Sequence, residues 1–300
     1  DMQKNRAFLT ISCYTTYSNL LHPERMLTMR KEILLPAIAV VGGGAGFALR
    51  RWELATAFEA DTGLPISGAP ATMALIALSV VVAAVLLILS FMGKYPRFSG
   101  YDQAFSAKDN TLYAMAGILS GFLLIGAGGL MAYDFATGAN PIYTRLIVAV
   151  LAVASGLCVM STVRDNFKGE NKGKYSVPLL IPAFAFCVWL IAAYQVRAGD
   201  PVQLDYVYEL FAIIAGLLGL YFIAGFSFDK GKCVPAVFFC LMGVYFSLVT
   251  LADEHDWATL VLYGFTILYL LTSSALLLYN AARPLPEEPV ENDTEGSSDV

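Results

Sequence analysis

The sequence has 300 residues, of which 57% are hydrophobic and only 14% are charged, whereas an ordinary soluble domain has roughly 25% charged residues. Stretches such as 69–92, 112–133 and 257–279 contain no Asp, Glu, Lys or Arg, and about twenty apolar residues suffice for a helix to cross a bilayer. The composition excludes an ordinary soluble domain, and the scattered basic residues exclude a nucleic-acid-binding surface. The sequence therefore predicts an all-α integral membrane protein surrounded by the lipid bilayer.

The first 28 residues differ from the rest, because they match neither a signal peptide nor a transmembrane segment. The segment Met29-Arg30-Lys31-Glu32 precedes an apolar run that begins at Ile33, and this order is typical of a natural start. We therefore expect residues 1–28 to be a poorly ordered N-terminal extension. Cys13 and His22 lie within it, and we assign them no role.

Eight apolar segments follow and predict eight transmembrane helices within a domain of residues 29–282. Short loops join consecutive segments, so we expect four antiparallel hairpins. Lys and Arg are more numerous in the loops on one side, and cytoplasmic loops collect these residues. The bias predicts a multi-pass protein of the cell membrane with both termini in the cytoplasm. The expected spans are residues 33–57, 70–92, 112–133, 142–162, 176–197, 206–227, 233–252 and 257–281.

The C-terminal segment, residues 283–300, is acidic and almost free of apolar residues. It also contains Pro284, Pro286 and Pro289. Segments of this composition cannot bury enough apolar surface to fold. We expect a disordered acidic cytoplasmic tail, and a short motif for binding a partner is the alternative.

Three loops on the expected outer side share a seven-residue pattern, at residues 57–63, 132–138 and 193–199. The pattern is Ala, an aromatic residue, Glu, Asp or Gln, two free positions, Thr or Ala, and Gly, with a Pro within three residues. Aromatic residues and a terminal Gly are common at membrane turns. The matched spacing nevertheless predicts that at least three hairpins are related as parallel internal repeats.

Arg50, Arg51 and Glu53 lie near the outer end of the first span. Charges inside a bilayer are costly and usually face the bundle interior in pairs, and residues three apart share a helix face. One interpretation is an outward-facing site for an anion or carboxylate, or an ion-pair lock. The other is that membrane burial ends at Leu49 and the helix continues into water.

An acidic turn, Asp253-Glu254-His255-Asp256, joins the last two spans. Its side chains include metal-ligand types, but consecutive residues on a short turn seldom converge on one metal, so we predict no metal site. The turn is either solvated charge or a counter-charge for Arg50 and Arg51 across the bundle.

Two more charged residues lie at the starts of spans. Glu209 either belongs to the polar site or is a favourable carboxylate near a helix N-terminus. Arg145 either pairs with an acid or extends its side chain to the membrane surface.

Glycines recur within the spans. Gly42 and Gly46, like Gly117 and Gly121, are spaced four apart, which is typical of close helix–helix contact. The glycine-rich run at 42–46 lies mid-span and lacks the Lys-Ser/Thr of a phosphate-binding loop. We therefore expect these glycines to serve helix packing.

No motif for catalysis or cofactor binding is present in the sequence, so we expect neither an enzyme nor a cofactor. One hypothesis is a binding or transport protein for a small polar or anionic solute. The other is a non-catalytic structural or sensory subunit that contacts other membrane proteins.

Overall fold

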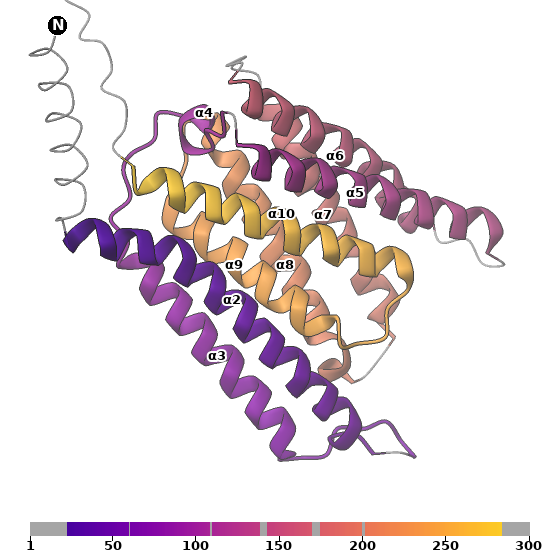
Figure 1. The fold of residues 1–300 in the computed structure, drawn as a ribbon. Helices are drawn as coiled ribbons and strands as arrows, with labels where there is room; N and C mark the ends of the chain where they lie inside the picture. Colours follow the sequence, from indigo (N-terminus) through magenta and orange to yellow (C-terminus); the bar gives the residue numbers. More distant parts are fainter. Residues whose placement is uncertain are drawn as a thin grey trace, which may run out of the picture.

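The structure is a computed structural model that describes residues 23–59, 61–108, 110–138, 143–169, 175–199 and 202–283. Eight helices among these residues are long and apolar enough to cross a membrane (Figure 1). The helical class and the eight predicted spans are therefore confirmed. The predictions made for residues 1–22 and 284–300 lie outside the described residues.

The helices begin and end close to the predicted boundaries, with one extension. The first helix starts at Pro23, about three turns before the apolar run at Ile33, because polar residues that are helical leave no trace in a hydropathy pattern. The long helices are α2 (Pro23–Thr56), α3 (Pro70–Phe91), α5 (Thr111–Thr137), α6 (Tyr143–Lys168), α7 (Ser176–Arg197), α8 (Gln203–Gly225), α9 (Cys233–Thr250) and α10 (Trp257–Ala281), and the short ones are α4 (Tyr101–Ala104) and η1 (Phe226–Phe228).

The two ends of the bundle differ in their connections. One end, which we call the Asp253 end, carries the connections α2–α3, α5–α6, α7–α8 and α9–α10. The opposite end, the Tyr101 end, carries α4 and η1 together with the connections α6–α7 and α8–α9.

Six of the helices form a closed ring. Contacts run from α5 to α6, α7, α8, α9 and α10 in turn, and α10 contacts α5 again. The pair α2 and α3 packs outside this ring, mainly against α9, as the lower edge of Figure 1 shows. Helix α9 is thus covered on both sides and is the most buried of the eight.

The Tyr101 end of the ring is closed by aromatic side chains. The rings of Tyr101 and Phe105 stack with centroids 4.9 Å apart, and Phe105 meets Phe226 edge to face at 5.4 Å. Asn280 Nδ2 donates to the backbone carbonyls of Ala104 and Ser106, at 2.9 and 3.0 Å. These contacts hold α4 over the end of α10.

The predicted packing glycines lie against neighbouring helices. A Cβ atom added to Gly46 would lie 2.6 Å from Val249 Cγ2, and one added to Gly42 would lie 3.0 Å from Val82 Cγ2. At Gly117 and Gly121 the nearest atoms belong to Val163 and Met160 of α6, at 2.5 and 2.3 Å. Helices α5 and α6 therefore approach more closely than side chains would allow.

The structure gives the predicted internal repeat no support. Residues 57–63 follow the end of α2, whereas most of residues 132–138 and 193–199 are helical. Gly63 has a φ of +66°, but Gly138 at the matching position has a φ of −74°. Helices α2 and α3 carry the seven-residue pattern at their connection but lie outside the ring, whereas α9 and α10 belong to the ring and lack the pattern.

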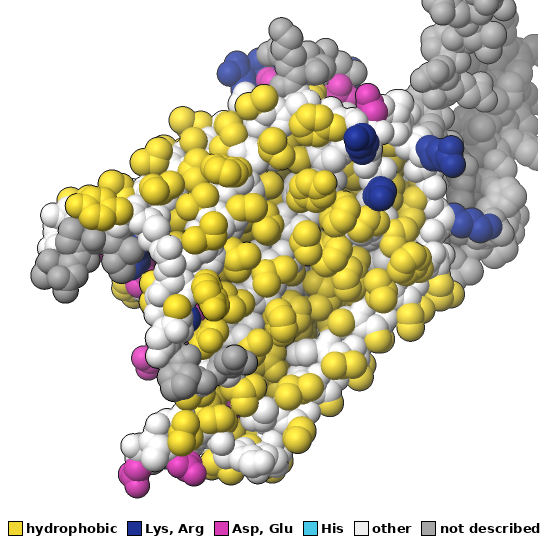
Figure 2. All heavy atoms as spheres, turned by 180° about the vertical axis from the view of Figure 1, so that it is seen from behind, with side chains coloured by type: hydrophobic (Ala, Val, Ile, Leu, Met, Phe, Trp, Pro, Cys, Tyr) yellow, Lys and Arg dark blue, Asp and Glu magenta, His cyan; other side chains and the backbone are white. Residues whose placement is uncertain are grey.

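Hydrophobic side chains cover the face of the molecule shown in Figure 2. Basic side chains gather toward one end of this face, at the upper right, and acidic side chains lie at both ends. Many large apolar residues on the long helices are exposed, among them Ile33, Val80, Met115 and Val150. An apolar surface between two charged ends is what a membrane-embedded bundle requires.

Candidate functional site

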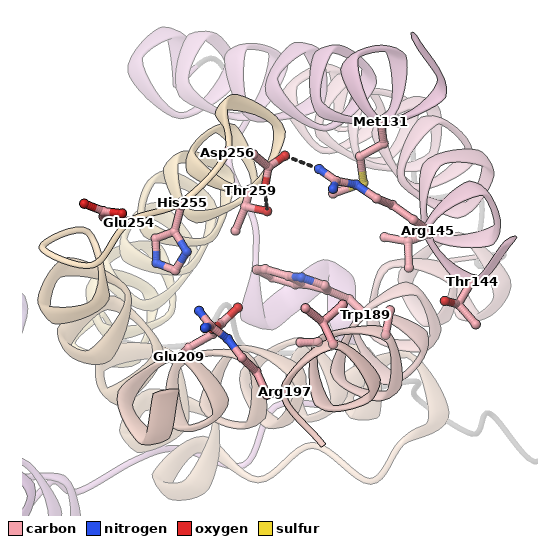
Figure 3. A pocket seen from close by; sticks show the side chains of 14 residues that line it. Met131, Thr144, Arg145, Trp189, Arg197, Glu209, Glu254, His255, Asp256 and Thr259 are labelled. Atoms are coloured by element: carbon pink, nitrogen blue, oxygen red, sulfur yellow. Dashed lines mark hydrogen bonds and ion pairs between the residues drawn. The ribbon is translucent and has the colours of Figure 1, made fainter. Parts of the chain in front are cut away.

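A pocket opens inside the six-helix ring at the Asp253 end and has a volume of about 170 Å³. Figure 3 shows its side chains converging from the surrounding helices. Residues of α5, α6, α7, α8 and α10 line it, together with the turn between α9 and α10. The pocket is therefore enclosed by the ring, and α2 and α3 take no part in it.

One wall of the pocket is an arginine held by two acids. Arg145, in the first turn of α6, forms an ion pair with Asp256 and lies 3.5 Å from Asp134 of α5. Thr259 Oγ1 donates a hydrogen bond of 2.6 Å to the other oxygen of Asp256. A cation in the first turn opposes the helix dipole, and the two carboxylates offset that cost.

The opposite wall carries a second arginine between two acids. Arg197, in the last turn of α7, lies 3.3 Å from Glu209 and 3.8 Å from Asp205 of α8. Asp205 and Glu209 are four residues apart and share a helix face. Both placements suit the helix dipoles, with a cation at a C-terminus and carboxylates near an N-terminus.

Glu209 is the most buried charged residue of the pocket, with only 8% of its surface exposed. Its Oε2 accepts both hydrogen bonds from Arg197, and its Oε1 accepts none from the described residues. In Figure 3 an oxygen of Glu209 points toward the centre of the pocket. Oε1 of Glu209 is thus available to a solute. A hydrogen bond to this oxygen would be favourable, because a buried polar atom without a partner is costly.

Trp189 of α7 forms the floor of the pocket, and Figure 3 shows its indole lying across the space between the walls. Its ring centroid lies 5.0 Å from that of Phe186 and 5.2 Å from that of Tyr263. Beneath it, a smaller cavity of about 10 Å³ shares the lining residues Val148 and Trp189 with the pocket. Trp189 therefore borders both spaces.

His255 joins the pocket to a second polar cluster. Its Nε2 lies 2.8 Å from the Thr250 carbonyl oxygen, which can only accept, so Nε2 donates. Thr250 Oγ1 donates to Asp253 Oδ2 at 2.8 Å, and Asp253 Oδ1 accepts from Arg50 Nε at 2.7 Å. Hydrogen bonds thus run from the pocket wall to Arg50.

Arg50 lies outside the pocket and is completely buried. Its Nη1 lies 2.7 Å from Glu53 Oε2 and 3.0 Å from the Leu204 carbonyl oxygen, and its Nη2 donates to the Asp205 carbonyl at 2.7 Å. With these partners and Asp253, the guanidinium ties α2 to α8 and to the α9–α10 turn. A donor set this occupied leaves little for a solute, so the arrangement is a lock between helices.

The residues predicted as one polar site divide into three groups in the structure. Glu209, Glu254, His255 and Asp256 line the pocket. Arg50, Glu53 and Asp253 form the buried lock, and Arg51, the next residue of α2, is exposed. The sequence also allowed the helix to continue into water after Leu49. That alternative is wrong for Arg50 and Glu53, because both side chains are fully buried in protein.

Trp189, Arg197 and Thr259 were not predicted as site residues. The sequence does contain an indication for Trp189. Tryptophan in membrane proteins is most frequent at the interfaces, whereas Trp189 lies well inside its span, which is an unusual position. Arg197 is one of few basic residues on its side of the membrane domain. Thr259 carries no comparable signal.

Within the described part of the chain, no three His, Cys, Asp or Glu side chains are placed to hold a metal ion. Comparison with known protein families, curated proteins and solved structures finds no match for this chain.

Proposed function

We propose that this chain binds a small polar solute in the pocket at the Asp253 end and carries it across the membrane. The observation that supports the proposal is Glu209, a charge more than nine-tenths buried whose Oε1 has no partner from the described residues. Ionisable groups within membrane spans are expensive and typically mark substrate pathways. A cavity of about 150 Å³ accommodates benzene, so a solute of similar size fits here.

A small cavity of about 10 Å³ beneath the pocket supports translocation over binding alone. The cavity beneath Trp189 is lined by Pro182, Ser155 and Leu262. Pro182 lies inside α7, and a proline in a helix removes one backbone hydrogen bond and favours bending. Movement of α7 about Pro182 would carry Trp189 with it, so we assign Trp189 the role of a gate.

We also infer that the Asp253 end faces the outside of the cell membrane, with both termini in the cytoplasm. The Lys and Arg residues of the connections at the Tyr101 end support this orientation, as the positive-inside rule expects. In this topology the four helix pairs joined at the Asp253 end are antiparallel hairpins. The pocket is then an outward-facing site.

A thermal-shift screen of solutes on the purified chain tests the proposal. The variant Ala192→Leu places a larger side chain in the pocket lining, and Ala45→Leu makes the same change at an exposed position of α2. A solute that stabilises the protein through the pocket should lose its effect in Ala192→Leu and keep it in Ala45→Leu. A screen without any hit of this kind would refute solute binding at this pocket.

A structural or sensory subunit remains the second candidate because of one surface feature. An apolar groove of about 360 Å³ lies between α7 and α8, with Leu180, Phe184, Cys187 and Tyr221 among its lining residues. Grooves of this kind accept a helix of another membrane protein or a lipid chain. Two results together would favour this candidate: cross-linking of Cys187 to a second protein in membranes, and no solute that binds the pocket in the thermal-shift screen.

A further inference from the structure

The charge of the pocket narrows the class of solute. Arg145 and Arg197 are its two cations, and each lies between two carboxylates. Arg145 lies between Asp134 and Asp256. Arg197 lies between Asp205 and Glu209. Glu254 also lines the pocket. The charged Arg, Asp and Glu side chains that line the pocket are thus two positive and three negative, Glu209, Glu254 and Asp256, which leaves one negative charge in excess. Asp134 and Asp205 add two further carboxylates behind the arginines.

This excess disfavours an anion. A carboxylate solute would have to displace an acid from one of the arginines or bind beside the three carboxylates that line the pocket. Charged walls around a cleft concentrate ions of the opposite sign, and Glu209, the most buried of these acids, is screened least by the solvent and its ions. The electrostatics of the pocket therefore favour a cation.

The walls also hold groups that recognise an organic cation rather than a bare ion. Glu209 Oε1 has no hydrogen bond from the described residues and can accept one from an ammonium N–H. Trp189 presents its indole to the same space (Figure 3), and tryptophan is the aromatic side chain that best attracts a cation to its face. Met131, Val148 and Ala193 complete the lining with apolar surface, which suits a short hydrocarbon chain.

We infer that the pocket selects small organic cations with an ammonium group, which Glu209 and Trp189 hold. This inference rests on the proposed function and specifies its substrate class. Glu209 accepts the hydrogen bond from the ammonium, and the indole of Trp189 lies against the charge. Arg145 and Arg197 orient the four acids around them and do not bind the solute.

Three probes with the same carbon skeleton test the inference: butylammonium, butyrate and the zwitterion 4-aminobutyrate. Their affinities are measured by titration calorimetry on the purified full chain in detergent. We expect butylammonium to bind at least tenfold more tightly than butyrate, with 4-aminobutyrate between them. Tighter binding of butyrate or of the zwitterion would overturn the inference and leave a solute pocket standing.

Variants at Glu209 provide the second arm. Glu209→Gln should weaken butylammonium at least tenfold and strengthen butyrate, because it removes one charge and frees Arg197, whereas Glu209→Asp should keep the preference for the cation. Glu59→Gln removes a charge from an exposed loop at the same end and should change neither affinity. An unchanged ratio in a folded Glu209→Gln protein would contradict the inference; if that protein does not fold, the order of the three probes on the natural sequence decides.

Failure of the inference and failure of the proposed function give different results. If a hit sensitive to Ala192→Leu exists but butylammonium does not bind, the cation preference is wrong and the pocket is still a solute site. If no probe binds and no such hit exists, both are wrong.

Discussion

Arg50 and Asp253 form a buried ion pair, with Nε 2.7 Å from Oδ1, although 203 residues separate them. The pair joins α2, which lies outside the ring, to the turn between α9 and α10. The same turn supplies His255 and Asp256 to the pocket. A single short turn is therefore in contact with both the lock and the site.

Removal of Arg50 should destabilise the protein strongly. Arg50→Ala leaves Glu53 and Asp253 without their cation, and breaking a buried pair in this way costs about 3–5 kcal/mol. The measurement is thermal or denaturant unfolding in detergent micelles. The neighbouring variant Arg51→Ala is the matched control, because Arg51 is exposed, and its melting temperature should hardly change. Equal effects of the two variants would contradict a lock at Arg50.

The coupling between Arg50 and Asp253 should be measurable on its own. In a double-mutant cycle with Arg50→Met and Asp253→Asn, we expect the double variant to lose less stability than the sum of the single variants, by about 0.5–3 kcal/mol. The pair Arg50→Met and Glu254→Gln should be additive, since Glu254 does not contact Arg50. Additivity in both cycles would mean that the ion pair contributes no stability.

The close approach of α5 and α6 gives a prediction at adjacent residues. A Cβ atom at Gly128 would lie 2.6 Å from the Ala149 carbonyl oxygen, whereas one at Gly129 would meet nothing within 4 Å. Gly128→Ala should therefore cost about 1–3 kcal/mol through overpacking. Gly129→Ala should be neutral or stabilise by up to about 1 kcal/mol, because alanine is the better helix former. The free energies of unfolding of the two variants, measured in parallel, test this prediction. A Gly129→Ala variant that is clearly destabilised would show that the helix faces are assigned wrongly.

The role of Trp189 as a gate predicts a change in permeation. Trp189→Leu should weaken the binding of butylammonium but raise its maximal rate of uptake into proteoliposomes at saturating concentration, because it joins the pocket to the cavity beneath it, whereas Trp189→Phe should retain much of the barrier. Trp52→Leu, at an exposed position of α2, is the control for loss of a tryptophan. Slower uptake in Trp189→Leu would indicate that the indole binds the solute without gating it.

Hydropathy was sufficient for the spans but not for their arrangement. Spans facing lipid and spans facing protein are both apolar, so the pattern along α9 does not distinguish the centre of the bundle from its edge. The polar residues before Ile33 are helical, and α4 is four residues long, so neither produces an apolar run. The ring is a property of packing that the sequence pattern does not encode.

Part of the polar network was predictable from charge pattern and spacing. The interpretation of the acidic turn as a counter-charge across the bundle agrees with the Asp253–Arg50 ion pair. A spacing of three indicates that Arg50 and Glu53 share a helix face, and their side chains are 2.7 Å apart. Their other partners include two backbone carbonyls more than 150 residues away, which no side-chain pattern reveals. The pocket is likewise assembled from separate helices, so Trp189 and Arg197 join Glu209 only in three dimensions.

The most direct test of solute binding uses Trp189 as its own reporter. The chain has three tryptophans, and Trp52 and Trp257 are exposed on the outside of the bundle, at 45% and 78%. In the variant Trp52→Phe/Trp257→Phe, titration with butylammonium should change the emission of Trp189 in a saturable manner, and the converse variant Trp189→Phe should show no such change. Emission of Trp189 that stays constant at saturating cation, or the same change in both variants, would contradict a solute site in this pocket.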